Sequence, residues 1–101
     1  AIDLVIVDLY PFEQTVASGA SEQDIIEKID IGGISLIRAG AKNFKDVVII
    51  PSKAQYPVLL ELLNKKGAVT DIEDRRMLAE SAFGVSSHYD TGIHDWFASL
   101  R

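Results

Sequence analysis

The sequence contains no cysteine, which excludes a disulfide framework and a thiolate metal site. Basic residues are also scarce, because ten Lys and Arg stand against 15 Asp and Glu, giving a net charge of −5. Non-specific nucleic-acid binding needs a basic surface that releases counterions, so we expect no nucleic-acid partner. No apolar run approaches the roughly 20 residues that span a bilayer, and no signal-peptide pattern is present at the start. We therefore expect a cytoplasmic protein without a membrane partner.

What is present is the composition of a small folded domain. Apolar residues make up 48% of the 101 positions and charged residues 25%, which is ordinary for a globular chain. At this length the chain holds at most one domain. The acidic balance does not exclude a small anionic ligand, because such a ligand responds to local groups.

Two segments, 2–9 and 46–50, predict β-strands. Both are continuous apolar runs rich in β-branched residues, a pattern typical of strands covered on both faces in a parallel sheet. Pro11 and Pro51 close them, because proline cannot donate to a strand ladder. The helical segments that alternate with these strands predict the α/β class.

Caps and helical spacing predict the remaining elements. Ser21 is expected to cap a helix that buries Ile25, Ile26 and Ile29. Thr70 is expected to cap the last long helical stretch. The expected helices run over 22–28, 34–43, 53–65 and 71–83 and through 89–100, with a loop at 11–20 and a tight turn at 30–33.

Two such strands cannot cover each other's faces and edges in a sheet of their own. We therefore expect the chain to be the second half of a larger doubly wound domain. The remaining strands would be missing from this chain or supplied by another one.

The end of the first strand is one candidate site. Asp8 and Tyr10 follow that strand, where open α/β sheets bind their ligands. The alternative is that residues 10–12 only pack a loop onto the domain. Metal binding is not expected, because His88 and His94 do not have a known ligand spacing, and His88 is expected to pack at a helix junction.

A second candidate lies where Gly32 and Gly33 lead from Asp30 into a helix. Glycines permit close approach of a ligand to the backbone, and the helix start favours an anion. Neither a dinucleotide fingerprint nor a Walker loop is present, so a plain turn capped by Asp30 explains the pattern equally well. Arg38 and Lys42, four residues apart, would suit a phosphate or carboxamide, or simply form a solvated face.

Taken together, the ordered segments resemble the IMP cyclohydrolase family, the N-terminal domain of bifunctional purine biosynthesis proteins that also carry AICAR formyltransferase. The similarity continues through 75–76, 82–83 and 89–90 and so covers nearly the whole chain. The motifs that carry it are DLVIVDLYPF (3–12), TVAS (15–18), IDIGG (29–33), LIRA (36–39) and AKN (41–43).

The resemblance implies a methylglyoxal-synthase-like parallel-sheet fold, of which residues 1–101 would form the second half. It implies that Lys42 is a proton donor and acceptor, and that Tyr10 and Asp30 are further catalytic residues. The residues expected to bind the nucleotide are Val7, Asp8, Ile31, Gly32, Gly33, Arg38 and Asn43. Three positions depart from the family pattern, which commonly has Asn at Asp8, Ala at Gly40 and His at Phe44.

The implied reaction closes the ring of 5-formamidoimidazole-4-carboxamide ribonucleotide to IMP with loss of water. It needs no metal or other cofactor, and the resemblance implies a homodimer. The fragment alone is expected to be inactive. The alternative is an effector domain of the same fold that binds a phosphorylated ligand without turnover; the joint presence of Tyr10, Asp30 and Lys42 favours the enzyme.

Overall fold

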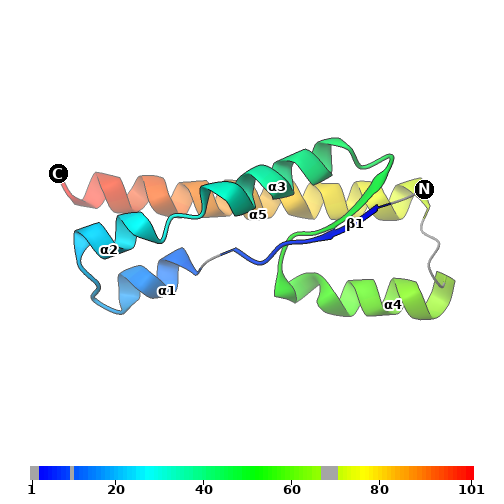
Figure 1. The fold of residues 1–101 in the computed structure, drawn as a ribbon, viewed down its shortest axis with the longest axis horizontal. Helices are drawn as coiled ribbons and strands as arrows, with labels where there is room; N and C mark the ends of the chain where they lie inside the picture. The colour runs from blue at the N-terminus through cyan, green and yellow to red at the C-terminus, as the bar shows by residue number, and fades with distance from the viewer. Residues whose placement is uncertain (1–2, 10, 67–70) are drawn as a thin grey trace.

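The structure is a computed structural model that describes residues 3–9, 11–66 and 71–101 and has a mixed α/β architecture (Figure 1). The predicted α/β class is confirmed. The elements follow in the order β1 (Asp3–Ile6), α1 (Phe12–Ala17), α2 (Glu22–Glu27), α3 (Ile31–Lys42), β2 (Val47–Ile50), the 3₁₀ turn η1 (Lys53–Gln55), α4 (Tyr56–Lys66) and α5 (Ile72–Ser99).

β1 and β2 pair in parallel and form a two-stranded sheet. Ile6 lies opposite Ile50 in the register, and the ladder continues one bond further because the Val7 N–H donates to the Ile50 carbonyl oxygen at 2.9 Å. Both strands are shorter than the predicted runs of 2–9 and 46–50. The two parallel strands were therefore correctly located, while their ends were not.

The core lies between β2, α3 and α5. All four residues of β2 are buried, and Ile37 of α3 and Leu78 of α5 are fully excluded from solvent. The backbone of α3 approaches β2 closely at Gly40, where an added Cβ would lie 2.9 Å from Cδ1 of Ile49. Ile49 is fully buried, so a side chain at position 40 would require the Ile49 side chain or its surroundings to shift.

β1 is covered less completely than β2. Leu4 is 52% exposed and Ile6 is 48% exposed, whereas Val7 belongs to the buried core. Side chains alternate across a strand, so Leu4 and Ile6 share one face. The prediction of strands covered on both faces is therefore confirmed for β2 and wrong for β1 within the described residues, because this face of β1 remains open to solvent.

The predicted loop at 11–20 is wrong, since it contains the short helix α1. Phe12 is buried and packs edge-on against the rings of Tyr89 and Trp96, with centroids 6.1 Å and 6.0 Å apart. No side chain caps the start of α1. Packing against α5, rather than a local sequence signal, therefore stabilises this helix.

The predicted cap of α2 is confirmed, because the Asp24 N–H donates to Oγ of Ser21 at 3.2 Å. Ile25 is buried as expected and Ile29 is partly buried. The expected burial of Ile26 is wrong, since this side chain is 44% exposed. With six residues, α2 is too short to present a wide apolar stripe to the core.

The helix predicted at 53–65 is replaced by η1 and α4. Pro57 occupies the first turn of α4, where its missing N–H costs no hydrogen bond. The expected cap at Thr70 lies outside the described residues.

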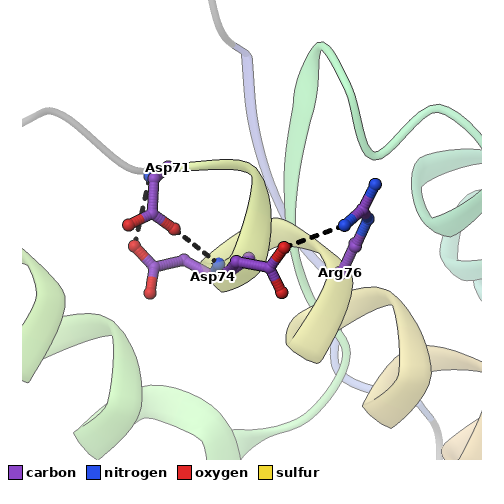
Figure 2. Close-up of polar contacts among 4 residues, drawn as sticks. Asp71, Asp74 and Arg76 are labelled. Atoms are coloured by element: carbon purple, nitrogen blue, oxygen red, sulfur yellow. Dashed lines mark hydrogen bonds and ion pairs between the residues drawn. The ribbon is translucent and has the colours of Figure 1, made fainter.

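α5 is one continuous helix, so the predicted separate pieces at 71–83 and 89–100 were wrong. No proline interrupts it, and Gly84 alone does not end a helix of this length. A reciprocal capping box starts it: the Asp74 N–H donates to Asp71 and the Asp71 N–H donates to Asp74, at 2.9 Å and 3.2 Å (Figure 2). Its 28 residues extend about 42 Å, and α1, α3 and β2 pack against it.

Candidate functional site at the carboxyl edge of the sheet

A cavity of about 280 Å³ lies at the carboxyl ends of both strands. Its walls come from the segments that follow β1 and β2 and from one face of α5. We call it the carboxyl-edge cavity. Ligands of open α/β sheets bind at this edge. The polar residues that line it are Asp8, Glu13, Gln14, Ser52, His88 and Tyr89.

Asp8 lies at this cavity as the sequence predicts. Its carboxylate is 3.4 Å from Nζ of Lys53, which follows the other strand. The side chains are 44% and 74% exposed, so solvent screens the ion pair and its contribution to stability is small. Val7, the preceding residue, is buried in the core and makes its backbone bond to β2. A ligand could therefore approach Val7 only through its main chain.

Tyr10 lies outside the described residues. Leu9 and Pro11, its neighbours in the sequence, both line the carboxyl-edge cavity.

Glu13 and His88 form a polar pair that sequence reasoning missed. Oε1 of Glu13 lies 2.8 Å from Nε2 of His88, and both side chains are largely exposed. The expected packing of His88 at a helix junction is wrong, because α5 is continuous there and the imidazole points to solvent. The pairing depends on α1, whose sequence has no local helix signal, so no sequence pattern indicated it.

Asp30 caps α3, and this interpretation of the glycine segment is confirmed. The Gly33 N–H donates to Oδ1 of Asp30 at 2.7 Å. A Cβ on Gly33 would lie 2.8 Å from the Asp30 carboxylate oxygens, so the carboxylate would have to shift to keep this cap. The predicted tight turn at 30–33 is wrong in one respect, because α3 already begins at Ile31 and neither glycine has a positive φ.

The main chain of Asp30 is tied to α5. Its N–H donates to the hydroxyl oxygen of Tyr89 at 3.0 Å, across 59 positions of sequence. Tyr89 and Asp30 also line a second, smaller cavity of about 100 Å³, which we call the Asp30 cavity. Tyr89 lines both cavities, so the N-cap of α3 and the carboxyl edge of the sheet lie next to each other.

The other predicted residues of α3 lie progressively farther from Asp30. Arg38 is exposed, and its guanidinium lies over the ring of Phe83 at 5.6 Å from the centroid. Lys42 is the last residue of α3 and Asn43 is its C-cap; both are exposed. Lys42 lies just before β2 begins, so it is at the amino edge of the sheet.

The structure therefore does not bring Asp30 and Lys42 together. α3 has 12 residues, and a helix rises 1.5 Å per residue, so about 18 Å separates its ends. A lysine side chain reaches only about a third of that distance. Asp8, Asp30 and Ile31 are near the two cavities at the carboxyl edge, while Lys42 and Asn43 lie at the opposite edge.

The described residues contain neither a cluster of metal-ligating side chains nor a membrane-spanning helix. Among residues 3–9, 11–66 and 71–101, no three His, Asp or Glu side chains are placed to hold a metal ion together. No described helix is both long and apolar enough to cross a membrane.

The chain is similar to known proteins of one family. Residues 40–101 match the family described as the AICARFT/IMPCHase bienzyme. The bifunctional purine biosynthesis protein PurH of Bacteroides thetaiotaomicron is 68% identical over 96 residues, which cover 95% of this chain and 19% of that protein. The PurH protein of Rhodospirillum rubrum is 47% identical, and the match covers 95% of this chain and 18% of that protein. The PurH protein of Myxococcus xanthus is 46% identical, and the match covers 97% of this chain and 19% of that protein.

The chain belongs to the AICARFT/IMPCHase bienzyme family. Its relatives are enzymes of purine biosynthesis. The chain spans about a fifth of the length of the curated relatives that it matches.

Proposed function

We propose that this chain forms part of the IMP cyclohydrolase site of a bifunctional purine biosynthesis enzyme. The observation that carries the proposal is family membership over nearly the whole chain, including 68% identity to a protein named for purine biosynthesis. The ordered motifs of the sequence favour the cyclohydrolase part of that enzyme over the formyltransferase part.

The proposed reaction joins two groups of one nucleotide, 5-formamidoimidazole-4-carboxamide ribonucleotide. The carboxamide nitrogen attacks the formyl carbon and loses a proton, which leaves the former carbonyl oxygen as a hydroxyl group. The formamido nitrogen then loses its own proton and forms a C=N bond to that carbon, while the hydroxyl group leaves with a proton as water. An amide nitrogen is a weak nucleophile, so the site must position it and accept its proton. Asp30 suits the acceptor role, because its carboxylate is held at the edge of a cavity.

We assign nucleotide binding to the carboxyl edge of the sheet. Ile31 and Asp30 line the Asp30 cavity, and Asp8 lines the carboxyl-edge cavity. Gly32, in the first turn of α3, has nothing within 4 Å of the place where a Cβ would be. A ligand could therefore approach the backbone there closely, and the helix start would favour an anionic group.

Lys42 needs a second copy of the protein in this proposal. One α3 holds Asp30 and Lys42 about 18 Å apart, so both cannot act on the same formyl group. Lys42 is exposed, and no polar side chain in the described part of the chain holds it. We propose that a homodimer places the Lys42 and Asn43 end of one copy at the Asp30 end of its partner.

We also propose that the two-stranded sheet is one part of a larger methylglyoxal-synthase-like sheet. The open face of β1, with Leu4 and Ile6 about half exposed, supports further covering elements. The isolated 101-residue chain is accordingly expected to be inactive.

The test uses the full-length bifunctional protein with substitutions at the two ends of α3. Asp30→Asn and Lys42→Ala should each lower turnover by about 10²–10⁴-fold, the usual contribution of a general acid or base, with a much smaller change in nucleotide affinity. Lys45→Ala is the control, because Lys45 is a nearby exposed cation with no assigned role. Unchanged turnover for Lys42→Ala would remove the catalytic assignment.

Co-expression of the Asp30→Asn and Lys42→Ala chains tests the two-copy site directly. In random dimers half the molecules are mixed, and one of their two sites is intact, so about one quarter of wild-type activity should return. Mixed dimers that remain inactive would show that each site is built from one copy.

An effector-binding domain of the same fold is the second candidate. The observation that favours it is the separation of Asp30 from Lys42 within one copy, because ligand binding does not require these groups to converge. Tight binding of the nucleotide by the full-length protein without any cyclisation would support this candidate.

A further inference from the structure

Tyr89 occupies a position that the proposed function does not explain. It lies on α5 and lines both the carboxyl-edge cavity and the Asp30 cavity. Figure 1 shows that α5 runs past the start of α3. Its hydroxyl oxygen accepts the Asp30 N–H at 3.0 Å. The contact joins α5 to the N-cap of α3 across 59 positions of the sequence.

The ring of Tyr89 is held in place from the side of α1. Phe12, which is 2% exposed, packs edge-on against it, and Trp96 packs against Phe12 in turn. Such edge contacts restrict the orientation of both rings. The position of the Tyr89 hydroxyl is therefore set by aromatic packing and not by its hydrogen bond alone.

The Asp30 N–H belongs to the N-cap of α3 and so lies before the first hydrogen bond of that helix. Without Tyr89, this N–H would turn to water or to the carboxylate of Asp30 itself. An aspartate often bonds its own main chain in this way. The same carboxylate now accepts the Gly33 N–H, so the loss of Tyr89 would give it a competing orientation.

We propose that Tyr89 is a positioning residue for Asp30, whose hydroxyl holds the N-cap main chain so that the carboxylate keeps one orientation at the Asp30 cavity. The inference rests on the proposed function, because it matters for turnover only if Asp30 accepts a proton there. Tyr89 acts through Asp30 and has no direct part in the reaction.

The protonation state of Tyr89 is compatible with this role. Burial raises the pKa of the Tyr89 phenol above its ordinary value; the Asp30 hydrogen bond opposes this shift, and the Asp30 and Asp90 carboxylates add to it. The hydroxyl therefore keeps its own proton at neutral pH. The groups that face it are Asp30, Asp90 and the ring of Phe12 on α1.

The test is Tyr89→Phe in the full-length protein, which keeps the ring and removes the hydroxyl. We expect kcat to fall by about ten- to a hundredfold while KM changes less than about twofold, because misorientation of a reacting group affects the transition state most. Tyr56→Phe is the matched control, since it removes a hydroxyl from α4. Phe12→Leu disturbs the packing of the ring and keeps the hydroxyl, so it should lower kcat less than Tyr89→Phe does.

A second substitution separates positioning from structural support. In an Asp30→Asn background, Tyr89→Phe should have no further effect on kcat, because the residue it positions is already disabled. A fall of the same size in both backgrounds would overturn the proposal, and so would an unchanged kcat for Tyr89→Phe alone. If the wild-type protein does not cyclise its nucleotide at all, the proposed function fails instead.

One measurement does not depend on the folding of any variant. In the wild-type protein, hydrogen–deuterium exchange of the segment around Asp30 should be slow, because the Asp30 amide is bonded to Tyr89. Exchange at the rate of an open loop would overturn the inference.

Discussion

The two ends of α3 are held by different forces. At the amino end, Asp30 receives the Gly33 N–H on its carboxylate and gives its own N–H to Tyr89. At the carboxyl end, Gly40 and Ala41 pack against β2, while the last side chains are exposed. Directional hydrogen bonds fix the orientation of one end, and apolar packing fixes the position of the other.

The two ends of α3 also show that residues close in the sequence can lie far apart in the structure. Asp30 and Lys42 are 12 positions apart in the sequence, and the family resemblance implies that both are catalytic residues. A continuous helix converts these positions into about 18 Å and places the residues at opposite edges of the sheet. Residues about 12 positions apart can meet only where the chain turns back between them, and α3 does not turn back.

The packed end should be the more sensitive to an added methyl group. Gly40→Ala places a Cβ 2.9 Å from Ile49, which is fully buried, so it should lower the free energy of unfolding by about 1–3 kcal/mol. Gly84→Ala is the control, because nothing lies within 4 Å of its Cβ position. The control should raise stability by about 0.5–1 kcal/mol, the gain from replacing a helix glycine.

The measurement is thermal unfolding of the full-length protein with either substitution. Ile49→Val removes the clashing Cδ1 and should restore part of the stability that Gly40→Ala loses. Equal stability of the Gly40→Ala and Gly84→Ala proteins would show that packing does not hold this end of α3.

At the capped end, Gly33→Ala should act through the Asp30 carboxylate. The new Cβ lies 2.8 Å from the carboxylate oxygens, so the cap must open at a cost of about 0.5–2 kcal/mol. Gly32→Ala meets no atom within 4 Å, so its stability in the same unfolding measurement should be unchanged or slightly higher. A stable Gly33→Ala protein would mean that the cap contributes little.

The smallest effect is expected at the ion pair beyond the strands. Asp8→Asn restores the residue common in the family and removes the pair with Lys53, which should change stability by less than about 1 kcal/mol because both groups are exposed. High salt should abolish the difference from the wild type, since it screens the pair. Asp3→Asn, at the other edge of the sheet, is the control. A large, salt-independent loss would contradict the exposed ion pair.

Much of the fold followed from local patterns. The α/β class, both strands, the Ser21 cap and the Asp30 cap are all confirmed, because each depends on neighbours within about four positions. α1 was missed because it lacks a cap and depends on Phe12 packing against α5. The break expected within α5 was wrong because isolated glycines such as Gly84 and Gly92 weaken a helix without ending it.

The sequence by itself determined the family, the α/β class and the places of both strands, and it supplied the candidates for nucleotide binding. Only the tertiary structure decided which of these residues meet. It joined Asp30 to Tyr89 across 59 positions and separated Asp30 from Lys42 along one helix. The physical reason is that residue type and spacing set local conformation, whereas side-chain packing between distant segments sets the distances on which a site depends.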